Sequence, residues 1–135
     1  MVEQETLRKI AANAQLIIDT LSPLSGFALG YNEESVRYVE KYVLSLRERA
    51  DAEIIDRLTN MIGCYLGECV RHSYGGQWAA SDSGLGISFN AQNGVYPFSK
   101  VGKLFEHGAE DSIVSFYTFI PMVFASALPP TGPAA

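Results

Sequence analysis

The stretch from Asp51 to Ser73 restricts the fold most, because it is a long amphipathic pattern with two glycines in its middle. Gly63 and Gly67 lie away from its apolar face, and each costs about 1 kcal/mol relative to alanine inside a helix. We therefore expect another element to pack closely on the glycine side, which would make this helix the centre of the fold. The apolar face is predicted to contain Ile54, Leu58, Met61, Ile62, Tyr65, Leu66 and Cys69.

Two further helices are predicted before this one. Apolar residues recur at helical spacing from Glu3 to Leu21, and the turn-forming run 22–26 then ends the pattern. Asn32 is placed to cap a second helix, because its side chain can accept hydrogen bonds from the first turn. The buried stripe of that second helix is predicted to be Val36, Val39, Tyr42, Val43 and Leu46.

After Tyr74 the pattern changes from helix to strand. Short apolar runs bounded by turn residues predict three strands, at 77–80, 85–89 and 95–98. The dipeptide Asn93-Gly94 is a strong indication of a tight hairpin between the second and third strands.

The end of the chain is predicted to return to helix. Pro97 cannot donate to a sheet, so it places the third strand at an edge or ends it. A short helix is expected over 99–107, closed by Gly108. Asp111 can cap a last helix, which should bend or end near Pro121.

The order of these elements predicts an α+β fold, with N-terminal helices, a three-stranded antiparallel meander and C-terminal helices. We expect one compact domain over 1–128, in which 1–29 forms the N-terminal helix and linker. Residues 129–135 are rich in proline and are predicted to be a disordered tail.

Composition restricts the classes of partner. The net charge is −5, and nucleic acids and anionic lipids both need a basic surface. We therefore predict no nucleic-acid partner and no membrane association. The uncharged run 112–135 does not change this, because its apolar part is shorter than the roughly 20 residues of a membrane span. A protein partner, basic in character, fits the charge better, and self-association is left open.

The two cysteines indicate the compartment. Cys64 and Cys69 are five residues apart on one predicted helix, so their side chains point in different directions and no disulfide is expected. Cys69 falls on the apolar face, whereas Cys64 falls on the polar side and could be reactive. Two reduced thiols are consistent with a cytoplasmic protein.

Catalytic and metal-binding patterns are sparse. His72 follows Glu68 by four residues, a spacing that suits a general-base pair or half of a metal site. The simpler interpretation is that His72 stabilises the negative end of its helix. Because a metal site needs three or four ligands, we predict neither a metal nor a cofactor, and we favour a function without catalysis.

One polar group remains near the end of the central helix: Glu68, Arg71, Tyr74 and Trp78. Glu68 and Arg71 are three residues apart and can form a surface ion pair, with Trp78 as a core residue. Alternatively, the aromatic and the arginine form an anchor for a protein partner. Both interpretations are open at the level of sequence.

Four short motifs resemble a widespread family of uncharacterised bacterial proteins. They are Leu66-Gly67-Glu68, Tyr74-Gly75-Gly76-x-Trp78, Tyr96-Pro97-Phe98-x-Lys100-Val101 and Glu110-Asp111-Ser112-Ile113. The resemblance covers about 30–124 and implies the fold, but no established activity. It adds Lys100 to Glu68 and Trp78 as positions of a functional face, or of a packing signature of the fold.

Two functional hypotheses follow. The first is a small acidic bacterial protein that binds another protein without catalysis, for example an immunity or inhibitor protein that covers a basic surface. The alternative is a small enzyme or ligand-binding protein that uses Glu68 with His72 or Arg71 in a pocket near Trp78. Whether the uncharged C-terminal helix belongs to the core or to an interface is left open.

Overall fold

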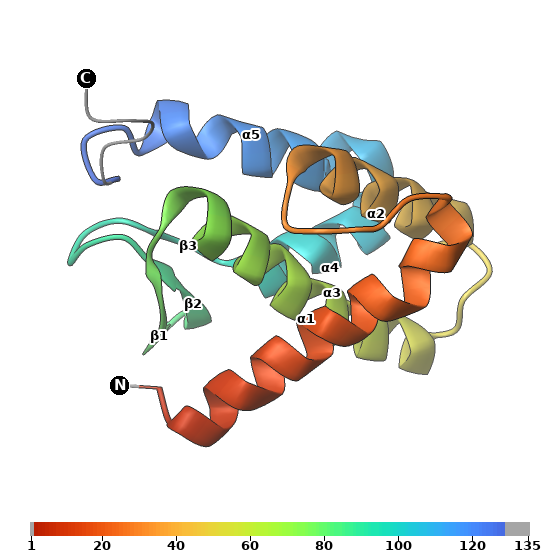
Figure 1. Ribbon diagram of the computed structural model, residues 1–135, viewed down its shortest axis with the longest axis horizontal. Coiled ribbons are helices and arrows are strands. Elements are labelled where there is room, and N and C mark those ends of the chain that lie inside the picture. Colours follow the sequence, from red (N-terminus) through yellow and green to blue (C-terminus); the bar gives the residue numbers. More distant parts are fainter. Residues whose placement is uncertain (1, 129–135) are drawn as a thin grey trace.

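The computed structural model describes residues 2–128, and within them the chain has the predicted α+β fold (Figure 1). Helix α3 runs through the middle, the sheet lies at one end of it, and buried residues from all five α-helices and the sheet form one core. The elements are α1 (Gln4–Ser25), α2 (Glu33–Leu46), α3 (Ala52–Tyr74), β1 (Gln77–Ser81), β2 (Gly84–Ser88), β3 (Gly94–Val95), α4 (Pro97–His107), the 3-10 helix η1 (Gly108–Asp111) and α5 (Ile113–Val123).

Helix α1 extends beyond its predicted end at Leu21. It continues through Pro23 to Ser25 and ends at Gly26, whose φ of 83° is left-handed. The last carbonyls of a helix have no partner within it, so they need other donors. The hydroxyl of Ser25 donates to the carbonyl of Ser22 at 2.9 Å, which supports this last turn. The prediction that the run 22–26 breaks the helix was therefore wrong, except at Gly26.

Helix α3 has the central position that its pattern predicted. Asp51 caps its first turn by accepting a hydrogen bond from the amide of Ile54 at 2.9 Å, as Asn32 does for α2 through Ser35. All residues from 62 to 70 are buried. Cys64 is among them, so its predicted place on the polar side was wrong. Helix α1 packs on that side, and the amide of Asn13 lies 3.9 Å from the Cys64 sulfur.

The glycine side of α3 is in close contact with two aromatic rings, as predicted. The ring of Phe98, from α4, lies so near Gly63 that a methyl group there would overlap it. The indole of Trp78, from β1, occupies the same position over Gly67. The two rings also contact each other, with centroids 5.7 Å apart. The glycines thus let the sheet and α4 approach the backbone of α3.

The sheet is antiparallel in the order β1-β2-β3. Trp78 is paired with Ile87, and Ile87 is paired with Val95. The third strand is shorter than the predicted 95–98, because Pro97 begins α4. Proline is favoured in the first turn of a helix, where no partner is needed for its missing N–H.

Asn93-Gly94 does not form the predicted hairpin turn. Gly94 is paired with Ser88 inside the sheet. A tight turn of this class needs a positive φ before the glycine, and within residues 2–128 only glycines have a positive φ. The loop is built instead on Asn90, whose side-chain oxygen accepts the amides of Gln92 and Asn93 at 2.9 Å each.

Helix α5 begins one residue later than predicted. Ser112, not Asp111, caps it by accepting the amide of Ser115 at 3.1 Å. Asp111 contacts Lys100 and His107 instead, as described below. Pro121 does not end α5, which continues to Val123. The tail predicted over 129–135 lies outside the described residues.

Candidate interaction surface

The polar group near the end of α3 is largely internal. Glu68 is only 6% exposed. Its Oε2 atom accepts hydrogen bonds from the indole of Trp78 at 2.9 Å and from Arg71 at 2.8 Å. The predicted pair of Glu68 and Arg71 is therefore present, but its description as a surface ion pair was wrong, because the carboxylate is buried under Trp78. Trp78 itself is 6% exposed and belongs to the core.

His72 lies beside this group. Its ring is stacked on Tyr31, with centroids 4.2 Å apart, and its Nε2 atom is 4.0 Å from Oε1 of Glu68. Burial raises the pKa of Tyr31, and the neighbouring Glu68 raises it further. Within residues 2–128, no group of three or more His, Cys, Asp or Glu side chains is placed to hold a metal ion.

Tyr74 and Lys100 have other neighbours. Tyr74 packs on Tyr117 of α5, with ring centroids 5.2 Å apart, and burial is the main cause that raises its pKa to about 12. Lys100 donates to Oδ1 of Asp111 at 3.2 Å, and the other oxygen of Asp111 is 2.6 Å from Nδ1 of His107. Lys100 therefore belongs to a second polar cluster, which joins α4 to η1, while Glu68, Arg71 and Trp78 form the first.

The hydrogen bond within the second cluster shifts the pKa values of His107 and Asp111 in opposite directions. The hydrogen bond with Asp111 raises the pKa of His107 above 6.5, and Glu106 and Glu110 contribute in the same direction. The same bond, followed by Lys100, lowers the pKa of Asp111 below 3.8. This cluster holds η1 in place at the C-terminal end of α4.

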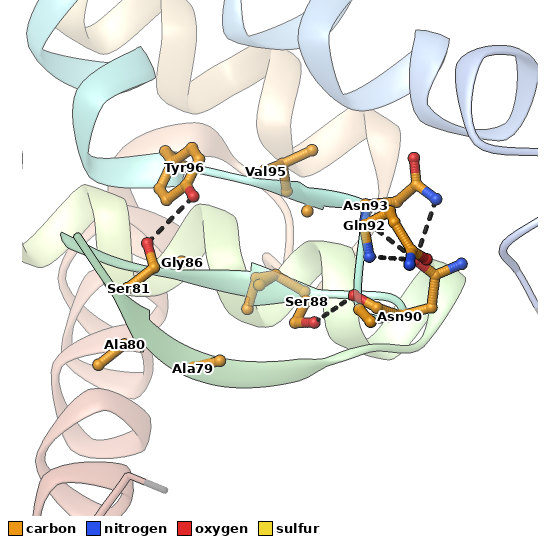
Figure 2. Close-up of a pocket in the computed structure, with 13 residues that line it drawn as sticks. Ala79, Ala80, Ser81, Gly86, Ser88, Asn90, Gln92, Asn93, Val95 and Tyr96 are labelled. Atoms are coloured by element: carbon orange, nitrogen blue, oxygen red, sulfur yellow. Dashed lines mark hydrogen bonds between the residues drawn. The ribbon is translucent and has the colours of Figure 1, made fainter. Parts of the chain in front are cut away.

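A shallow hollow of about 280 Å³ lies on the outer face of the sheet (Figure 2). Tyr96 stands over Gly86 at one side, and its hydroxyl is 3.2 Å from that of Ser81. The hydroxyl of Ser88 donates to the carbonyl of Asn90 at 2.9 Å. No charged residue lines this hollow, and Glu68 does not line it. The hollow therefore gives no support to a reaction centre at Glu68.

Helix α5 has apolar side chains on two sides. Ile113, Val114, Tyr117 and Ile120 are buried. On the opposite side, Phe119 is 54%, Met122 76% and Val123 69% exposed; these three residues are called the α5 face below. Among residues 2–128, no helix has both the length and the apolar character that a membrane span requires. The uncharged helix was predicted from the sequence, but this exposed face was not. The one signal that points to it is the presence of apolar residues on every side of the helix.

Charge is distributed unevenly along the chain. Asp82 is the only charged residue between positions 74 and 99, and positions 112–135 carry none. The end of the sheet and the end of α5 adjoin, because Phe89 and Phe124 are in contact with ring centroids 5.3 Å apart. Most of the charged residues thus lie in α1 to α4, whereas the α5 face lies on a helix that carries no charge.

Comparison of the chain with models of known protein families, with curated proteins and with solved structures found no match. The resemblance of its four motifs to a family of uncharacterised bacterial proteins accordingly stays a prediction. In this structure several motif residues contact one another, as Gly67 and Glu68 contact Trp78, and Lys100 contacts Asp111.

Proposed function

We propose that this protein binds another protein without catalysis and that the α5 face forms the centre of the interface. The observation that carries the proposal is the exposure of Phe119, Met122 and Val123 along one side of a helix in an uncharged region. Centres of protein interfaces are depleted of charged residues and enriched in aromatic residues and methionine. The α5 face has this composition.

The contacts of Glu68 support an interface at α5 instead of at the end of α3. Oε2 of Glu68 already accepts two hydrogen bonds, and Trp78 covers the carboxylate. An anchor residue contributes to binding when it is free to fill a pocket on the partner. Trp78 is buried in this protein's own core, so it is not free in this way.

The charge of the chain indicates the kind of partner. At a net charge of −5, the helical part would attract a surface with a basic rim and speed its association. We place the protein in the bacterial cytoplasm, where it would cover a basic protein in the manner of an immunity or inhibitor protein.

The alternative function, a small enzyme or ligand-binding protein, has one observation in its favour. Oε1 of Glu68 lies 4.0 Å from Nε2 of His72, and the side chain of Arg71 beside it is 38% exposed. A small ligand could approach these side chains from solvent. Changing Arg71 and His72 to alanine tests this function independently of the α5 face.

The proposal is tested by quantitative affinity capture from the source cell with tagged full-length protein. The test variant is Phe119→Ser with Met122→Ser, and the matched control is Leu24→Ser, an equally exposed apolar residue on α1. We expect a stoichiometric partner whose recovery falls at least about 30-fold with the test variant, as for loss of roughly 2 kcal/mol at an interface centre. Recovery with Leu24→Ser should equal that of the unchanged protein.

Three results would contradict the proposal. They are the absence of any partner, equal recovery with all variants, and loss of the partner only when Arg71 and His72 are changed. Unfolding experiments check that the test variant is still folded. The test variant should keep its stability within about 0.5 kcal/mol, because surface substitutions have small effects.

A further inference from the structure

The two edges of the sheet are protected differently. Proteins guard exposed edge strands with short length, charge, proline or a bulge, because unpaired backbone groups attract other strands. The β3 edge has only Gly94 and Val95, and Pro97 follows two residues after Val95. The β1 edge is five residues long, Gln77–Ser81, and contains neither a charged residue nor proline. One edge is therefore guarded, and the other is open.

The open edge has unused hydrogen-bonding groups. In an antiparallel sheet, alternate residues of an edge strand point their N–H and C=O groups away from the neighbouring strand. In the part of the chain that the structure describes, no hydrogen bond joins the backbone of positions 77–81 to an element other than β2. Gln77, Ala80 and Ser81 are exposed. Only the backbone of another extended strand matches such an alternating row of donors and acceptors.

The strand is also held rigidly. Trp78, the second residue of β1, anchors the strand to α3 through contact with Gly67 and the hydrogen bond to Glu68. All five residues of β1 are paired with β2. Because the edge is already ordered, pairing with a further strand costs little conformational entropy.

We propose that β1 pairs antiparallel with β1 of a second copy, around a two-fold axis at Ala79, so that one sheet runs through both subunits. This register sets Gln77 opposite Ser81 of the partner subunit, and Trp78 opposite Ala80 of the partner subunit. A polar pair thus meets on the outer face, and no large side chain opposes Trp78 on the inner face. Figure 2 shows Ala79 and Ala80 on β1, at the margin of the sheet away from β3.

The self-complementary register favours a second copy as the occupant, and charge does not oppose such pairing at β1. Two molecules that each carry a net charge of −5 repel one another where their acidic surfaces meet. Like charges directly opposite each other in a sheet are destabilising, and β1 brings none together. Two copies can therefore pair through β1 without placing like charges opposite each other.

The area of contact determines the expected strength. A single pair of five-residue strands is small beside the roughly 1,600 Å² of a standard stable interface. The dimer should therefore be reversible and depend on concentration. It leaves the α5 face free, so this inference is independent of the proposed function.

The test is sedimentation equilibrium of the full chain over about 1 µM to 1 mM, a range that covers weak dimers. The variants are Ala79→Lys and Ala79→Glu, which each set like charges side by side at the axis. Ala91→Lys is the control, because it adds the same charge at an exposed loop position. Circular dichroism of each variant checks that it folds.

We expect the apparent mass of the unchanged protein and of Ala91→Lys to rise from 14.7 kDa toward twice that value. Each Ala79 variant alone should stay monomeric, and an equimolar mixture of the two should associate again through opposite charges. A monomeric unchanged protein at the highest concentration would overturn the proposal. So would a dimer that both Ala79 variants leave intact, or one that Met122→Ser abolishes.

Discussion

The indole nitrogen of Trp78 donates a 2.9 Å hydrogen bond to the carboxylate of Glu68, and this bond joins the C-terminal half of α3 to the first strand of the sheet. Gly67, the residue before Glu68, leaves room for the indole to lie on the helix. Adjacent residues thus supply the space and the polar partner for one large side chain.

Gly67→Ala tests the space over the helix. A methyl group there would overlap the indole, so we expect a loss of about 1–3 kcal/mol in unfolding free energy, as for overpacked cores. Gly102→Ala is the control within α4, where the new methyl group would meet only Thr59 at 3.8 Å. That change should stabilise the protein by about 0.4–1 kcal/mol, because alanine restricts the unfolded chain. Urea unfolding measures both variants, and equal stabilities would contradict the packing described.

The bond between His107 and Asp111 predicts a pH dependence. The pKa of His107 is raised from 6.5 in the folded state. The contribution of His107 to the unfolding free energy is therefore complete below pH 6.5, and it is lost as the pH rises through the raised pKa. The pKa of Asp111 is lowered from 3.8, so its contribution is present above pH 3.8 and is lost as the pH falls through the lowered pKa.

The variant Asp111→Asn should move the NMR titration midpoint of His107 down toward 6.5. Between about pH 6 and pH 8, the unchanged protein should then lose more stability than the variant does. Lys100 also loses its partner in this variant. An unchanged midpoint for His107 would mean that the two side chains do not bond in solution.

Both thiols should react slowly in the folded protein. Burial is the main cause that raises the pKa of Cys69 to about 12, and burial also raises the pKa of Cys64. Because the thiolate is the reactive form, a disulfide reagent at neutral pH should label neither cysteine until the protein unfolds. Rapid labelling of Cys64 alone in the native state would show that α1 does not cover it as described.

Much of the fold could be predicted from the sequence, because its strongest patterns depend on local chemistry. The apolar repeat of α3 and the Asn32 cap depend on residues within a few positions of each other. The two glycines of α3 predict a close neighbour. Gly63 and Gly67 required close contacts, and Phe98 and Trp78 supply them.

The errors arose where a contact that the sequence pattern did not indicate decides the outcome. Cys64 looked polar by helical position, but α1 packs over it. Asp111 looked like a cap, but Lys100 and His107 bind it instead. Asn93-Gly94 looked like a turn, but the side chain of Asn90 builds the loop. In each case a contact that the pattern did not indicate prevails over the predicted one.

The candidate site was predicted only in part. The spacing of Glu68 and Arg71 predicted their ion pair, but it could not show that Trp78 would bury the carboxylate. Burial depends on how the sheet folds back on α3, which no local pattern encodes. The α5 face was hidden for a similar reason, since an apolar helix can be buried on one side or on all sides.

A double-mutant cycle on the unfolding free energy tests most directly whether Glu68 is structural. The single variants are Glu68→Met and Trp78→Phe, and the cycle isolates the interaction between the two side chains. Because hydrogen bonds to charged groups contribute about 1.5–3 kcal/mol, we predict a coupling of at least about 1 kcal/mol. A coupling below roughly 0.3 kcal/mol, within the additivity of independent sites, would contradict the account and leave the carboxylate free for a role in binding or catalysis.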